Sequence, residues 1–330
     1  MSTSASPAPT CEPVAPKRQS RIRPARLILL TVAAAFAVAG GLAYRHFWFS
    51  RPAGEGPAGP AVPREPFQRV WSDRKVLLLG LGDSVTAGFG VGPAHSYVGR
   101  LAQNPSDEWP DMRGLCLRAV LPSLEVLNVA VSGSTSLEHV EMIAQRVPQQ
   151  GPEVFGIVVM TTGGNDLIHN YGRTPPREGA AYGASFEQAR PWIENFAHRL
   201  DRMIALIEGR FPGGCHVFLG DIYDPTDGLG DARNAGLPPW PDGLQILCAC
   251  NEVLRACAAR RPNVHVVPIH DAFLGHGIHC VQFWREHYRR DDPTYWYGAN
   301  LEDPNDRGYD ALRRLFLIKM AKAAEAMFGP

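Results

Sequence analysis

Five short apolar runs recur along the chain, and each ends in small or polar residues. Runs of four to eight apolar residues bounded by turn residues are typical of strands buried on both faces. The predicted strands cover residues 76–81, 125–131, 154–161, 216–222 and 264–269. The predicted helices cover residues 96–103, 114–120, 137–149, 186–209, 244–260 and 307–327. This alternation predicts an α/β domain with a parallel five-stranded sheet covered by helices on both faces.

A charge-free apolar stretch, Leu27–Tyr44, precedes this domain and is closed by Arg45. As a helix it would be about 27 Å long at ~1.5 Å per residue, close to the ~30 Å hydrocarbon core of a bilayer. It is apolar on every face, which disfavours a helix of a soluble core. We therefore predict a transmembrane anchor over residues 27–45. A cleavable signal peptide is the alternative, because Ala37-Val38-Ala39 resembles a processing site.

The segments around the apolar stretch set the expected topology. Residues 1–26 are rich in Pro and Ser and then basic, which predicts a disordered segment. Basic residues before the anchor and few after it place the amino terminus in the cytoplasm and the rest outside it, in the periplasm or beyond. Residues 46–66 are rich in Pro, Gly and Ala and predict a flexible linker. The folded domain is then expected over residues 67–330.

Composition narrows the classes of partner. The chain has 33 Lys and Arg against 33 Asp and Glu, so no global charge favours nucleic acid. Seven scattered cysteines form no CxxC pair, and we expect no metal site. With 45% hydrophobic residues, the chain can bury a sizeable core.

Three predicted strands end in similar sequences that combine glycine with a small polar residue. They are GDS at residues 82–84, SGS at 132–134 and GGND at 163–166. The carboxyl ends of parallel strands share the edge where open α/β sheets bind ligands. The backbone N–H groups of Ser84 and Gly133 and the Asn165 amide would there surround a developing oxyanion. One such donor contributes ~2.7–4 kcal/mol of transition-state stabilisation. Each motif alone is more often a turn or a cap, whereas all three together favour catalysis.

GDSVTAG at residues 82–88, the Gly133 turn and GGND at 163–166 resemble the first three blocks of the SGNH, or GDSL-type, hydrolases. The resemblance covers about residues 75–325. It implies a flavodoxin-like three-layer α/β/α domain that cleaves or transfers ester-linked acyl groups without a cofactor. It also implies that Ser84 is the nucleophile, and that Ser84, Gly133 and Asn165 form the oxyanion hole.

The fourth block departs from this family. The family pattern Asp-x-x-His-Pro-Asn supplies the acid and the base of a triad, but residues 300–305 read NLEDPN. Asp303 therefore stands at the base position and Asn300 at the orienting position. A carboxylate near pKa 3.9 is ~2.6 units less basic than an imidazole near 6.5. Asp303 is a weak direct base unless burial raises its pKa.

A histidine from elsewhere is the better candidate for the base. His276 and His279 follow the last predicted strand within a long irregular segment, 274–300, and His287 is a third candidate. Because triads are defined by geometry, we expect one of these imidazoles to lie over Ser84, with Asp303 orienting it. Alternatively, each of them only lines or caps a loop. Aromatic residues of the same segment are candidates for a wall against a sugar or an acyl chain.

The sequence thus predicts an anchored, extracytoplasmic serine hydrolase of carboxylic esters acting through an acyl-enzyme. Its expected substrate is a small-molecule or glycan acyl ester. Two alternatives stay open. One is an O-acyltransferase of the same fold that acts on a glycan. The other is a non-catalytic module that binds a glycan or a lipid.

Overall fold

The structure is a computed structural model that describes residues 24–329. Most of the predicted disordered segment, 1–26, lies outside the described residues. The chain divides into two compact units between Arg45 and His46, and the second unit contains the sheet. Helix α1 (Pro24–Phe49) precedes the sheet. It is long and apolar enough to cross a membrane, although a signal sequence near the amino terminus would pass the same test.

The five strands form one parallel sheet in the order β2-β1-β3-β4-β5. The strands are β1 (Lys75–Gly82), β2 (Leu124–Asn128), β3 (Val154–Thr161), β4 (Cys215–Gly220) and β5 (Val264–Val267). The predicted α/β fold is therefore confirmed. Beyond Asn128 the chain still follows β1, because Val129 N donates to Gly80 O and Val131 N donates to Gly82 O.

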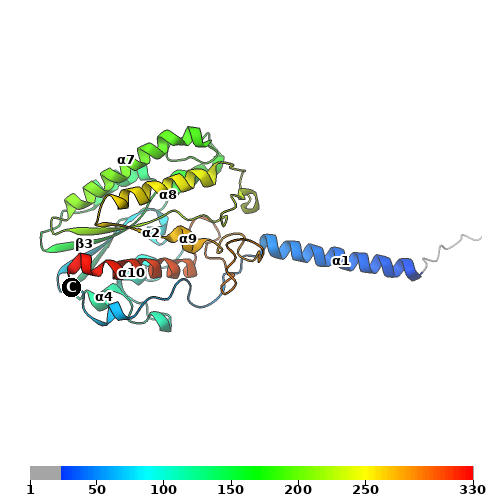
Figure 1. The fold of residues 1–330 in the computed structure, drawn as a ribbon, viewed down its shortest axis with the longest axis horizontal. Helices are drawn as coiled ribbons and strands as arrows, with labels where there is room; N and C mark the ends of the chain where they lie inside the picture. The colour runs from blue at the N-terminus through cyan, green and yellow to red at the C-terminus, as the bar shows by residue number, and fades with distance from the viewer. Residues whose placement is uncertain (1–23, 330) are drawn as a thin grey trace, which may run out of the picture. The chain divides into compact units, whose positions relative to one another are not determined.

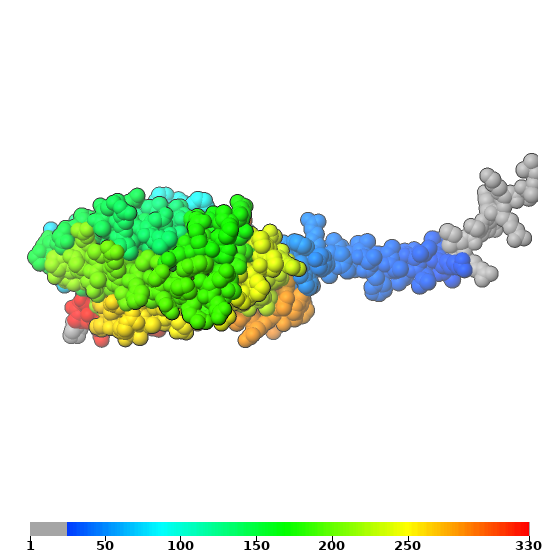
Figure 2. All heavy atoms as spheres, turned by 90° about the horizontal axis from the view of Figure 1, so that it is seen from above, coloured from blue at the N-terminus to red at the C-terminus, as the bar shows by residue number. Residues whose placement is uncertain are grey.

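Helices cover both faces of the sheet. They are α2 (Ser84–Ala87), α3 (Tyr97–Ala102), α4 (Leu117–Val120), α5 (Ser136–Arg146), α6 (Gly164–Ile168), α7 (Phe186–Arg210), α8 (Gly243–Ala259), α9 (Ile269–Phe273) and α10 (Asp306–Phe328). Helices α7 and α8 lie on one face, and α4 and α10 lie on the other (Figure 1). The sheet side chains alternate between two hydrophobic cores, one on each face. In the space-filling view the green surface of the folded unit includes α7 (Figure 2).

Residues 46–66, expected as a free linker, pack on the folded unit, and we call them the strap. Ala58 is buried, and its N–H donates to Asp310 Oδ2 at 3.0 Å. Tyr295 N donates to Pro52 O at 2.7 Å, and Val62 is also buried. The folded unit therefore begins at His46 and not near residue 67, because buried apolar and hydrogen-bonded positions are interspersed among the prolines and glycines.

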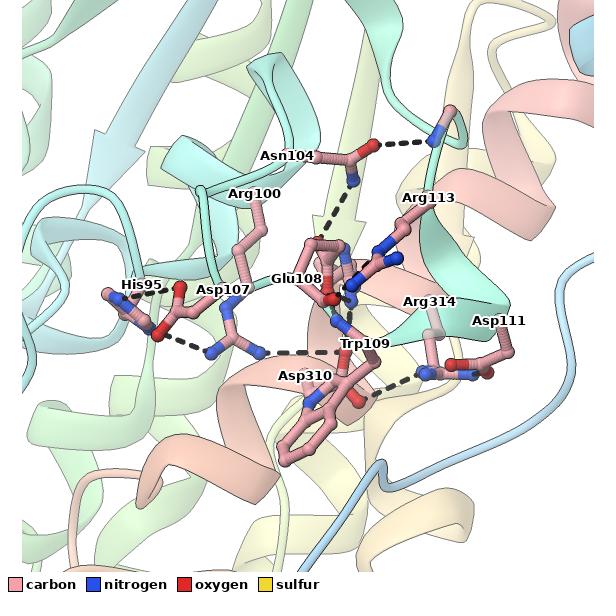
Figure 3. Close-up of polar contacts among 12 residues, drawn as sticks. His95, Arg100, Asn104, Asp107, Glu108, Trp109, Asp111, Arg113, Asp310 and Arg314 are labelled. Carbon is pink, nitrogen blue, oxygen red and sulfur yellow. Dashed lines mark hydrogen bonds and ion pairs between the residues drawn. The ribbon is translucent and has the colours of Figure 1, made fainter.

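A buried ion cluster joins α10 to the segment that follows α3 (Figure 3). Arg313 binds Glu108 through both terminal nitrogens, at 2.6 and 2.8 Å. It also donates to Asp310 Oδ1 at 2.8 Å. Arg314 bridges Asp310, at 3.0 Å, and Asp111, at 2.6 Å. Because Asp310 also accepts from the strap, the cluster holds three distant parts of the chain together.

Candidate active site

Ser84 stands at the sharp turn from β1 into α2. Gly82 makes this turn with φ of 116°, and a Cβ there would lie 1.9 Å from Thr161 O, so only glycine fits. Asp83 caps the helix: its Oδ1 accepts from Val85 N at 3.1 Å and from Thr161 Oγ1 at 2.6 Å. Burial raises the pKa of Asp83 to about 6. The turn therefore fixes Ser84 at the carboxyl edge of the sheet.

The second and third predicted motifs meet beside this edge. Asn165 lies in the first turn of α6, and its Nδ2 donates to Ser134 O at 2.9 Å. An amide nitrogen carries two hydrogens, so the second N–H remains for a ligand. Gly133 precedes Ser134 and adopts φ of 81° in an exposed position. The Gly133 loop and the Asn165 side chain are thus joined by a hydrogen bond.

A buried histidine braces the two loops from behind. His139 Nε2 lies 2.8 Å from Ser134 Oγ, and its Nδ1 lies 2.9 Å from Thr162 Oγ1. Burial lowers the pKa of His139 to about 4, so the imidazole is neutral near pH 7. A neutral imidazole has one donor and one acceptor, which suits two hydroxyl partners. His139 therefore fixes the loops that carry Gly133 and Asn165.

The Asp303 carboxylate lies near enough to Ser84 for the serine to affect its titration. Burial raises the pKa of Asp303, and hydrogen bonding from Ser84 and Asn300 opposes the rise. Asn300 Nδ2 donates to Asp303 Oδ2 at 2.7 Å. Within residues 24–329, Oδ1 has no partner of regular geometry, so the Ser84 contact is long or bent. Catalytic hydrogen bonds are often of this kind without substrate.

The three candidate histidines lie elsewhere. His276 stacks on Trp296 with ring centroids 3.4 Å apart, and its Nδ1 lies 2.9 Å from Thr294 O. Burial lowers its pKa to about 4. His279 is buried with its Nε2 3.6 Å from Asp231. Neither these two nor His287 lines the cavity that reaches Ser84 in the described part of the chain. The prediction that one of these histidines lies over Ser84 as the base therefore has no contact to support it.

Ser84 and Asn165 line the same cavity of ≈ 150 Å³. Its other walls are mostly apolar and include Ile168, Tyr182, Ile222, Leu237, Trp240, Leu244, Leu247 and Ile269. Each acid that lines it accepts a hydrogen bond: Glu302 from Tyr171, Asp224 from Gly228 N, Asp221 from His270 N and Asp83 from Val85 N. No group of three His, Cys, Asp or Glu side chains among residues 24–329 is arranged to hold a metal ion.

Sequence reasoning missed two parts of this site. His139 lies in the helix predicted over residues 137–149 but was not singled out, because only the folded chain brings it to Ser134 and Thr162. Tyr182, Trp240 and Leu244 lie outside the strands and the three motifs, so no local pattern connected them to Ser84. The aromatic wall was expected from segment 274–300, of which only Ile278 lines the cavity.

Comparison with solved structures found proteins that are similar to this chain. The chain is similar to an acetylxylan esterase from Geobacillus stearothermophilus, with 18% identity, 76% and 94% of the two chains covered, and a TM-score of 0.45. It is also similar to an extracellular lipase from Streptomyces rimosus, with 18% identity, coverage of 74% and 99%, and a TM-score of 0.49. No curated protein sequence matches the chain.

The model of the GDSL-like lipase/acylhydrolase family matches residues 81–311, a range that contains the end of β1, Ser84, Asn165 and Asp303. Because this match spans most of the chain, the chain belongs to the GDSL-like lipase/acylhydrolase family, which is a family of acyl-ester hydrolases.

Proposed function

We propose that the chain is an acyl-ester hydrolase in which Ser84 is the nucleophile and Asp303 takes its proton directly. The observation that carries this proposal is the Ser84 hydroxyl at an apolar cavity, with the Asp303 carboxylate on one side and the Asn165 amide in the same cavity wall. No metal or organic cofactor is needed for these steps.

In the first step Ser84 Oγ attacks the acyl carbon while Asp303 accepts the hydroxyl proton. The tetrahedral oxyanion accepts hydrogen bonds from the Asn165 amide and from the N–H groups of Gly133 and Ser84. The intermediate then breaks, and the leaving alcohol receives the proton from Asp303. In the second half-reaction, water gives a proton to Asp303 and attacks the acyl-enzyme. The second tetrahedral intermediate then breaks at the bond to Ser84 Oγ, which takes the proton back from Asp303, and the acid is released.

The electrostatics of the pair support a carboxylate base. In the family pattern, a carboxylate and a neutral histidine together carry one negative charge. The pair of Asn300 and Asp303 carries the same net charge. In this chain, however, the charge lies on the residue at the base position, next to Ser84, and not on the orienting residue. Burial raises the pKa of Asp303, which increases its proton affinity. The neutral Asn300 amide holds Oδ2 without competing for the proton, so Oδ1 remains for Ser84.

The nucleophile is tested by covalent labelling with a fluorophosphonate probe. We expect wild-type protein to be labelled slowly and Ser84→Ala to be unlabelled, because the probe reacts with activated serines. Ser132→Ala changes an exposed serine of the Gly133 loop and is the matched control, which should label like the wild type. An unlabelled wild-type protein that is folded by circular dichroism would contradict a serine enzyme.

The cavity also supports a choice of acyl group. An apolar cavity of about this size can hold a benzene-sized group, so it offers room for roughly six carbons. Each buried methylene contributes ~0.8 kcal/mol, about fourfold in kcat/KM. We expect p-nitrophenyl hexanoate to exceed the acetate on the order of 10²-fold in kcat/KM.

A blocking substitution tests this expectation. Leu244→Trp should remove the preference for hexanoate while turnover of the acetate remains, since Leu244 lines the cavity and Ser84 is unchanged. Retained acetate turnover also shows that the variant is folded. A wild-type preference for acetate would rule out the cavity as an acyl site. Adding an acceptor sugar to the same assay separates hydrolysis from acyl transfer.

We also propose that α1 is an uncleaved anchor and that the folded unit lies outside the cytoplasm. Supporting this, the uncharged run of α1 continues beyond the Ala37-Val38-Ala39 sequence as far as Tyr44. Basic residues precede the helix, as the positive-inside rule expects for a cytoplasmic amino terminus.

A further inference from the structure

Three aromatic side chains that contact one another lie outside the site of the proposed reaction. We call Trp48, Phe283 and Trp284 the aromatic rim. Phe283 is 62% exposed and Trp284 45%, and Trp48 is half-buried. Single exposed apolar residues are ordinary, but adjoining ones mark an interaction site. Phe283 and Trp284 adjoin each other with ring centroids 5.0 Å apart.

The rim is held in place from behind. The Phe47 ring lies 4.7 Å from that of Trp284 and 5.7 Å from that of Phe283. Trp48 lies 5.9 Å from Trp284. The buried Gln282 side chain donates to Phe47 O at 2.9 Å, and Phe47 packs against the core on the α10 face. The exposed rings are therefore held in place by Phe47, which is itself fixed to the folded unit.

The position of the rim in the chain indicates what covers it. Arg45 ends the uncharged stretch, and only His46 separates it from Phe47. Aromatic residues are enriched where a membrane-spanning helix leaves the hydrocarbon and enters the headgroup layer. Phe283 and Trp284 come from a distant part of the sequence but contact Phe47 and Trp48, which closely follow the end of this stretch.

We propose that the aromatic rim inserts into the headgroup layer of the bilayer that α1 enters, as a second attachment of the folded unit to the membrane. This inference rests on the uncleaved anchor proposed above and is independent of the chemistry at Ser84. The partner of the rim is thus a lipid surface. The indole rings of Trp48 and Trp284 are amphipathic, which suits the headgroup layer.

The test uses the full chain in phosphatidylcholine vesicles that contain a lipid with a nitroxide at a shallow position. A nitroxide quenches tryptophan fluorescence on contact. With seven tryptophans in the chain and Trp48 and Trp284 at the rim, we expect about two in seven to be quenched. Trp284→Phe should lower this share to about one in six. Trp71→Phe is the control and should raise it, because Trp71 packs on Phe67 and is not one of the rim residues.

An equal quenched share in wild type and Trp284→Phe would overturn the proposal. The intact mass of the same preparation reports separately whether α1 is present. A mass that lacks α1 would refute the anchor and with it the bilayer placement of the rim, whereas labelling of Ser84 would be unaffected. A quenched share that falls in Trp284→Phe and rises in Trp71→Phe supports insertion of the aromatic rim into the headgroup layer.

Discussion

Replacing Asn300 by Asp and Asp303 by His together is expected to raise the turnover of p-nitrophenyl hexanoate by about 10²-fold. The double change supplies an imidazole where the Asp303 carboxylate now faces Ser84, and a carboxylate where Asn300 now donates to it. An imidazole is ~2.6 pKa units more basic than an ordinary carboxylate, about 3.5 kcal/mol of proton affinity. Burial already raises the pKa of Asp303 and so removes part of this difference in basicity. The expected gain in turnover is therefore smaller than the full difference would give.

Three controls identify the source of the gain. Adding Ser84→Ala to the double variant should abolish turnover. Asp303→His alone should gain less, because nothing would then orient the imidazole or stabilise its charged form. The acid limb of the pH profile should move toward 6.5, since the base acts only when unprotonated and its rate is lost as pH falls through its pKa. A folded double variant with wild-type turnover would show that Asp303 is not at the proton-transfer position.

Arg313→Met is expected to destabilise the folded unit by about 3–5 kcal/mol, because it leaves Glu108 and Asp310 buried without their shared cation. Arg255→Met is the matched control. It removes an exposed arginine that pairs with the exposed Glu252 at 2.9 Å, and surface pairs of this kind contribute little to stability. Urea unfolding followed by circular dichroism measures both. Equal small losses would mean that the ion cluster does not hold α10 in place.

The pH dependence of stability gives a second readout for the same cluster. Burial alone would raise the pKa of Glu108, but the Arg313 guanidinium outweighs burial and holds it below its usual range. A carboxylate with a depressed pKa stabilises the fold above its unfolded pKa, near 4.3, and this contribution is lost as pH falls through the folded value. We expect Arg313→Met to lose this part of the acid sensitivity, because Glu108 would no longer be held ionised by a partner.

Much of the fold was predictable because its signals are local. Continuous apolar strands ending in glycine and a polar residue define both the parallel sheet and its functional edge. Gly82 illustrates this: its place after an apolar run indicated a turn that no other residue makes, and the approach of Thr161 O explains why. Ser84 and Asn165 were identified in the same way, because each directly follows a buried strand and a glycine.

The identity of the base and the packing of the strap depended on contacts between distant segments, which the sequence does not show. Nothing local distinguishes Asp303, which faces Ser84, from His276, which stacks on Trp296. The histidines were favoured for their intrinsic basicity, but His276 stacks on Trp296, His279 lies beside Asp231, and none of the three candidates lines the cavity. The strap was hidden for a similar reason: its Pro and Gly content resembles a tether, and only the partners of Ala58 reveal its packing.

The packed strap bears on the anchor proposed above. A free chain of residues 46–66 would let the folded unit move roughly 25 Å from its attachment point, at about 5–6 Å times the square root of its length. Because Ala58 and Val62 are buried, the strap does not supply that length of free chain. With the proposed anchor in place, the substrates of the proposed reaction would have to lie at or near the surface of the bilayer.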